Sequence, residues 1–182
     1  MSEILKTVSK NGKTLSIRKT ALSERENILS LQREVVNAIA NKEWFVEITA
    51  DEITESADMD FIIGAYDGDR LVAFSLTVLN RDCDRSVGKK YGFDPEKCAT
   101  FDSVFVHPEY RGFGLQQAFI ELAKQKAREN GATSLWATVS PYNIYSHRNC
   151  EQRGFYCYKC NEYLYGGRLR DVMVLEIRPD FT

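Results

Sequence analysis

Residues 104–119, with the sequence VFVHPEYRGFGLQQAF, restrict the fold more strongly than any other part of the chain, because they predict a strand, a tight glycine turn and a helix in immediate succession. The Val-Phe-Val segment 104–106 favours an extended backbone, and Pro108 ends the strand. Gly112 and Gly114 permit backbone dihedrals and a close approach to a ligand that a side chain would prevent. This stretch therefore predicts a turn that leaves room for a ligand at the start of a helix.

From Leu115 onward the apolar residues follow helical spacing until Asn130 provides a stop signal. The backbone N–H groups of residues 111–116 would point towards one spot at the positive end of the helix dipole, beside Arg111. We therefore expect a phosphate or pyrophosphate group there. The turn lacks the Lys-Ser/Thr ending of a P-loop and is shorter than the dinucleotide-binding G-x-G-x-x-G pattern. An ordinary strand-to-helix turn is the alternative interpretation.

A second segment places polar residues at the end of the next predicted strand, residues 134–140. Asn143 then opens a short helix, with Ser146 three residues later and Gly154 and Phe155 at the helix end. Both motifs therefore follow neighbouring strands at their carboxyl ends, which is where ligands collect in open α/β sheets.

Together, the two segments resemble the motifs of the GCN5-related N-acetyltransferase (GNAT) superfamily, over roughly residues 95–178. Arg111 and Gly114 match its Arg-x-x-Gly-x-small pattern, whereas Gln116 stands where a small residue is usual. The resemblance implies an α/β (α+β) fold with a mixed, mostly antiparallel central sheet of about seven strands flanked by helices. It also implies acetyl-CoA as the co-substrate and no metal.

The same resemblance implies where acetyl-CoA would bind. Its pyrophosphate would lie on the glycine turn, and its pantetheine arm would pair with strand backbone in a gap between two splayed strands. Asn143 would hydrogen-bond a pantetheine amide, although capping its own helix is the alternative role. The residues expected to contact acetyl-CoA are Phe105, Val106, Arg111, Gly112, Phe113, Gly114, Leu115, Gln116, Asn143 and Ser146.

Acetyl transfer to an amine requires a base for the amine. Asp102 shares a strand face with Val104 and Val106 and is the candidate catalytic base, provided that burial raises its pKa. An ion pair between Asp102 and a Lys or Arg is the alternative. Glu43 and Glu47 are further candidates for contact with a cationic substrate.

The departing thiolate requires an acid. Members of the family commonly place a Tyr seven residues after the motif Asn, but this chain has Cys150 there, and a buried helix residue is the alternative role for that thiol. Tyr145 is a second candidate acid. Tyr165 and Arg168, near the last hairpin, would either line an acceptor pocket or pack at the sheet edge.

With 182 residues, of which 43% are hydrophobic, the chain is expected to form a single domain over residues 1–182. The formal net charge of −2 argues against a nucleic-acid surface. No signal-peptide pattern or membrane-length apolar run is present, and the five cysteines are irregularly spaced, so we expect a cytoplasmic protein. Cys157 and Cys160 are expected on opposite faces of a strand, which argues against a shared metal ion.

The rest of the chain predicts alternating strands and helices. The expected strands cover residues 14–19, 59–66, 71–79, 100–106, 155–163 and 171–178, with hairpin turns at 67–69 and 166–167. Further expected helices are one with a Ser23–Glu26 capping box, one over 114–130 and one over 143–153. Residues 80–98 have no periodic pattern and predict a functional cover or mobile loop, and residues 44–57 remain ambiguous.

The function that this sequence favours is transfer of an acetyl group from acetyl-CoA to a primary amine, by direct attack in a ternary complex. The alternative is a catalytically silent acyl-CoA-binding module of the same fold, which Cys150 and Gln116 keep open. The residues do not choose between a small-molecule and a peptide amine. Many relatives form homodimers, but no unpaired apolar stripe in this sequence requires one.

Overall fold

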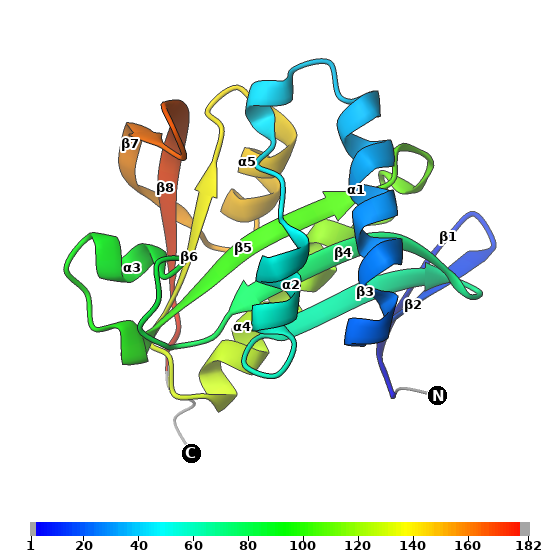
Figure 1. The fold of residues 1–182 in the computed structure, drawn as a ribbon, viewed down its shortest axis with the longest axis horizontal. Helices are drawn as coiled ribbons and strands as arrows, with labels where there is room; N and C mark the ends of the chain where they lie inside the picture. The colour runs from blue at the N-terminus through cyan, green and yellow to red at the C-terminus, as the bar shows by residue number, and fades with distance from the viewer. Residues whose placement is uncertain (1–2, 179–182) are drawn as a thin grey trace.

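The computed structural model describes residues 3–178, which form one eight-stranded sheet with helices on both faces (Figure 1). The strand order is β1-β2-β3-β4-β5-β6-β8-β7, and every neighbouring pair is antiparallel except β5 and β6. The strands are β1 (Ile4–Lys10), β2 (Lys13–Lys19), β3 (Phe61–Asp67), β4 (Arg70–Val78), β5 (Cys98–Val106), β6 (Ser134–Val139), β7 (Tyr156–Leu164) and β8 (Arg168–Glu176). The predicted mixed, mostly antiparallel sheet is confirmed.

The structure has one strand more than the predicted seven, and the additional strand is β1. This edge strand is mostly exposed, so the alternation of apolar and polar residues that marks a half-buried strand is weak in its sequence. Asn11 and Gly12, both with positive φ, join β1 to β2 in a tight hairpin.

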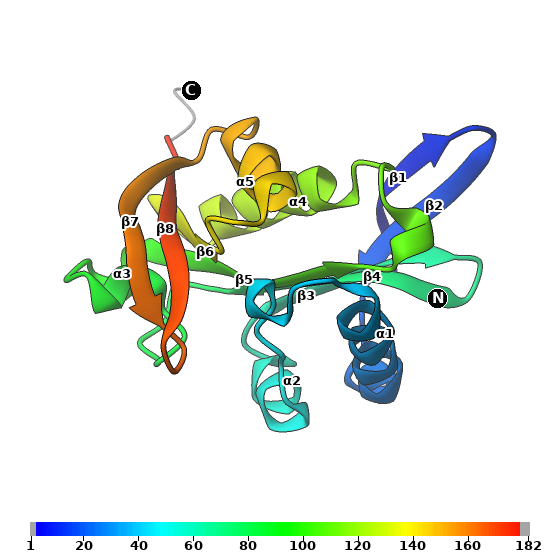
Figure 2. The same cartoon turned by 90° about the horizontal axis from the view of Figure 1, so that it is seen from above.

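Helices cover the sheet in two layers (Figure 2). On one face lie α1 (Arg25–Ala38) and α2 (Ala50–Ser56), and on the other lie α4 (Leu115–Glu129) and α5 (Ile144–Glu151), while the short α3 (Val87–Lys90) lies at the side near β6. Each layer has its own apolar cluster: Ile28, Leu31 and Val35 of α1 pack in one, and Leu115 and Phe119 of α4 in the other. Both helical stripes predicted from the sequence are thus buried against the sheet.

The predicted Ser23 cap of the first helix is wrong. The chain instead makes a 3₁₀ turn over Leu22–Glu24, and α1 begins at Arg25. The Glu24 carboxylate accepts a hydrogen bond from the Ala21 N–H at 3.2 Å and also pairs with Arg18 at 3.0 Å. The ion pair with a neighbouring strand fixes Glu24, so the capping interaction forms two residues earlier than the sequence pattern predicts.

Two regions without a clear sequence pattern contain short helical elements. Residues 80–98 include α3 and a 3₁₀ turn at Pro95–Lys97, so this stretch is partly packed rather than a plain loop. A Cβ at Gly88 would lie 2.6 Å from the sulfur of Cys98, which shows how closely α3 approaches β5. In residues 44–57, Thr49 and Glu52 form the capping box of α2.

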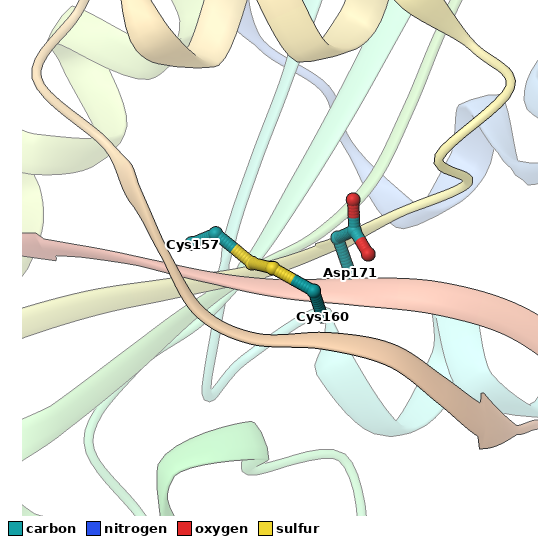
Figure 3. A group of neighbouring side chains, drawn as sticks. All are labelled: Cys157, Cys160 and Asp171. Atoms are coloured by element: carbon teal, nitrogen blue, oxygen red, sulfur yellow. A yellow bond between two sulfur atoms is a disulfide. The ribbon is translucent and has the colours of Figure 1, made fainter.

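The prediction that Cys157 and Cys160 point to opposite faces is also wrong. Their sulfur atoms are joined in a disulfide, and together with a carboxylate oxygen of Asp171 they lie within 4.8 Å of one another (Figure 3). The pairing of β7 with β8 shifts register on both sides of Lys159, and Asn161 has a φ of 59°. This irregular backbone interrupts the alternation of side chains along β7, so Cys157 and Cys160 lie on the same side of the strand.

Candidate active site

The sheet opens between β5 and β6, as Figure 1 shows. The two strands pair only where residues 98–100 meet residues 134–136, after which they separate. From residue 101 onward, β5 pairs with β4 alone. One edge of β5 therefore presents unpaired backbone groups to a gap in the sheet.

The alternation of backbone groups along β5 identifies which residues face that gap. The N–H of His107 donates to the carbonyl oxygen of Val72 on β4 at 2.9 Å. Because successive residues of a strand turn their backbone groups to opposite sides, Val106 and Val104 face the gap, whereas Phe105 faces β4. The expectation for Val106 fits this geometry, but the gap-facing neighbour is Val104 rather than Phe105.

A pocket of about 310 Å³ occupies the gap. Its walls come from segments that are distant in sequence: the stretch before α2 with the first turn of α2, the loop before α3 and the end of α3, β5, the end of β6, the start of α5, and the β7–β8 hairpin. The residues lining it are Trp44, Phe45, Val46, Glu47, Ile48, Glu52, Asp84, Arg85, Lys90, Asp102, Ser103, Val104, Thr138, Val139, Ser140, Asn143, Ser146, Tyr165 and Arg170.

The glycine turn has the geometry that the sequence predicted. Gly112 and Gly114 have φ values of 80° and 74°, in the left-handed region that favours glycine, and α4 begins directly afterwards. No side chain caps the helix at Gly114, and a Cβ there would meet no atom within 4 Å. The described residues thus leave the start of α4 open to an anionic ligand beside Arg111.

Lys10 is a cation near this turn that the sequence did not reveal. Its Nζ would lie 2.8 Å from a Cβ at Gly112, and it lies 5.9 Å from the centre of the Phe113 ring. The residue comes from β1, the strand that was not predicted, so only the tertiary structure brings its charge to the turn.

The Gln116 side chain extends towards α5. Its amide N–H donates to Ser146 Oγ and its carbonyl oxygen accepts from Asn149, both at 2.8 Å. Asn143 accepts a hydrogen bond from the Ser146 N–H at 3.2 Å, which is the helix-capping role that the sequence left open. Gln116 therefore ties the start of α4 to the start of α5, and Asn143 and Ser146 also line the pocket.

Asp102 lines the pocket and forms the ion pair that the sequence left open as the alternative to a base role. Its Oδ2 accepts from Arg85 at 2.5 Å and from Ser103 Oγ at 2.8 Å. Burial on its own would lower the pKa of Arg85, but the Asp102 carboxylate outweighs that effect and the net pKa is raised. The guanidinium group thus stays charged and holds the carboxylate at the pocket wall.

The structure does not bring either candidate acid to the pocket. Cys150 is 1% exposed within the apolar cluster beneath α4 and α5, and burial raises the pKa of its thiol to about 12. Tyr145 is 71% exposed and does not line the pocket. Tyr165 does line it: its hydroxyl lies 3.0 Å from Thr138 Oγ1, and burial raises the pKa of Tyr165.

The opening between the parallel strands β5 and β6 and the uncapped start of α4 have the geometry that suits an extended ligand with a phosphate group. A family model described as the Acetyltransferase (GNAT) family matches residues 25–155. The chain belongs to this family and is an acyl-CoA-dependent N-acyltransferase. The family resemblance inferred from its motifs is confirmed.

Solved structures show the same fold at low sequence identity. One is yncA from Salmonella typhimurium with its cofactor acetyl-CoA, with a TM-score of 0.68, 18% identity, and coverage of 90% of this chain and 94% of that chain. The ribosomal-protein-S18-alanine N-acetyltransferase from Escherichia coli has a TM-score of 0.67 at 17% identity, with coverage of 92% and 96%.

N-acetylglutamate synthase from Neisseria gonorrhoeae, solved with coenzyme A and N-acetyl-glutamate, has a TM-score of 0.66 at 14% identity, with coverage of 91% of this chain and 35% of that chain. A search of curated protein sequences found no significant match. Within residues 3–178, no helix is long and apolar enough to cross a membrane.

Proposed function

We propose that the protein transfers the acetyl group of acetyl-CoA to a primary amine by direct attack in a ternary complex. The observation that carries this proposal is the pocket in the gap between β5 and β6, where unpaired strand backbone and acidic side chains meet. Direct transfer needs no protein nucleophile. Cys150 was expected as an acid and not as a nucleophile, so its burial removes one candidate proton donor and leaves direct attack possible.

In the proposed complex, the N–H groups at the start of α4, with Arg111 and Lys10, hold the pyrophosphate. The open space at Gly114 fits this role, since a ligand oxygen can approach the backbone there. The backbone of Val104 and Val106 pairs with the pantetheine arm and polarises the thioester carbonyl. Asn143, at the pocket wall, orients the same arm.

The proton steps are assigned to pocket residues. Asp102 uses Oδ2 for Arg85 and Ser103, and no described residue donates a hydrogen bond to its Oδ1. This oxygen is free to accept a hydrogen bond from the attacking amine, and Glu47, which lines the same pocket, is the proposed base. The Tyr165 hydroxyl, which lines the pocket and is protonated at neutral pH, is the proposed acid for the departing thiolate.

Calorimetry of the purified protein with acetyl-CoA and with CoA is the first test. Binding of both, followed by release of free thiol with members of an amine panel, is the expected result. Binding without thiol release from any amine would favour the silent acyl-CoA-binding module. The absence of binding by folded protein would refute the assignment of the glycine turn.

A further inference from the structure

Arg170 is a buried cation at the pocket wall. It lies on β8, is 2% exposed, and lines the pocket. Its Nη1 donates to the carbonyl oxygen of Leu169 at 2.7 Å, whereas its Nη2 has no hydrogen-bond partner among the described residues. A buried guanidinium with an unused donor is costly, so such groups usually have a ligand or an acid close by.

Within residues 3–178, no carboxylate forms an ion pair with Arg170. Its cross-strand neighbour Glu162 pairs with Lys159 at 3.2 Å instead. The charge of Glu43 raises the pKa of Arg170, but burial and the charge of Arg168 outweigh this effect and the net pKa is lowered. The guanidinium therefore lies in surroundings that supply too little negative charge.

The other guanidinium groups around the pocket already have partners. Arg85 pairs with Asp102, and Arg168 donates to the carbonyl oxygens of Lys42 and Phe45. Lys90 lies 5.4 Å from the centre of the Tyr165 ring. Arg170 is thus the cation of this set whose planar donor group remains available to a ligand in the pocket.

We propose that Arg170 binds the carboxylate of the acceptor, so that the acceptor is a small amino acid or a similar amine that carries a carboxylate. This inference rests on the proposed acetyl transfer. The guanidinium fork suits a carboxylate, and Glu47 and the free oxygen of Asp102 suit an amine in the same pocket. A pocket of about 310 Å³ that also receives the acetyl end of the thioester leaves room for a small acceptor only.

The kinetic test compares each amino acid with its own carboxamide, which keeps the amine and removes the negative charge. Wild-type protein should prefer the amino acid by roughly 30-fold or more in kcat/KM. Arg170→Met should remove this preference through KM, and leave the affinity for acetyl-CoA unchanged. Arg70→Met removes an exposed cation outside the pocket, and should keep the preference.

A binding test does not depend on turnover. N-acetylalanine should raise the melting temperature of wild-type protein more than N-acetylalaninamide does, and the difference should vanish in Arg170→Met. Because the substitution removes a buried charge without an acid partner, the ligand-free variant should melt at the same or a higher temperature. A purely structural Arg170 would instead lower it.

Three results would overturn the inference. The first is that Arg170→Met still prefers amino acids over their carboxamides, and the second is that wild-type protein prefers the carboxamides. The third is that Arg170→Met loses affinity for acetyl-CoA by the same factor as it loses the preference for amino acids. A failure of the proposed acetyl transfer can be distinguished from a failure of this inference. Acetyl-CoA binding without acetylation of any amine would refute catalysis, while the N-acetylalanine comparison would still decide whether Arg170 binds a carboxylate.

Discussion

Substitution of Gly114 by valine should weaken acetyl-CoA binding by more than its effect on stability explains. Gly131, at the other end of α4, provides the matched control for the effect on stability. Gly114 precedes α4 with a φ of 74°, and Gly131 follows α4 with a φ of 81°. A Cβ would meet no atom within 4 Å at either position. The two substitutions therefore impose similar backbone strain and no steric clash within the described protein.

The strain of a side chain in the left-handed region costs about 1–2 kcal/mol. For a chain of this size, each kcal/mol corresponds to roughly 2–4 °C in melting temperature, so both variants should melt about 2–8 °C lower. Only Gly114→Val should weaken acetyl-CoA binding. Loss of one charge-assisted hydrogen bond costs about 1.5–3 kcal/mol, which is roughly a 10- to 150-fold increase in Kd.

Thermal melts and calorimetry with acetyl-CoA would measure both quantities on the same samples. The reasoning is refuted if Gly114→Val binds acetyl-CoA as tightly as wild type. It is equally refuted if Gly131→Val loses affinity to the same extent, since the effect would then come from strain in α4 rather than from the turn.

Four further substitutions test other parts of the site and fold. Tyr165→Phe should lower kcat by about 100-fold or more in a thiol-release assay, with little change in acetyl-CoA affinity. In the same assay Cys150→Ala should leave the rate and its pH profile unchanged. If Cys150→Ala lowers the rate and Tyr165→Phe does not, the acid is the Cys150 thiol. Lys10→Gln should raise the Kd for acetyl-CoA by roughly 3- to 10-fold, with an effect that shrinks at high salt, and a salt-independent change would contradict an electrostatic role. Burial on its own would raise the pKa of Glu24, but hydrogen bonds from Arg18 and Tyr66 outweigh it, so the net pKa is lowered below its usual 4.5. Its contribution to stability is therefore present above pH 4.5 and lost as the pH falls through the lowered folded-state pKa, and Glu24→Gln should weaken the fall of melting temperature in acid.

Local sequence signals predicted the parts of the site that local geometry controls. The turn at Gly112 and Gly114 needs left-handed backbone conformations, and such a requirement can be recognised from residue types a few positions apart. Likewise, the helical stripe that starts at Leu115 and the cap at Asn143 depend on spacings within one element. These features, with the mixed order of strands and helices, were sufficient to indicate the GNAT fold.

Other expectations failed where distant parts of the chain decide the outcome. The Ser23 cap was displaced by the ion pair of Glu24 with Arg18, and the strand irregularity near Asn161 brought Cys157 and Cys160 together. Neither interaction leaves a periodic signal. The sequence also could not show that Cys150 is enclosed in the apolar cluster, because burial depends on which elements pack above it.

The sequence by itself determined the class of fold and the place of the glycine turn before α4, because both follow from hydrophobic periodicity and from backbone conformations that few residues tolerate. Only the tertiary structure decided the chemistry of the pocket. Asp102, Tyr165 and Arg170 come from β5, the β7–β8 hairpin and β8, and only the fold brings them to the wall of one pocket. There Asp102 pairs with Arg85, and Arg170 is buried. Desolvation and ion pairing act through space, so their effects appear once the sheet has opened between β5 and β6.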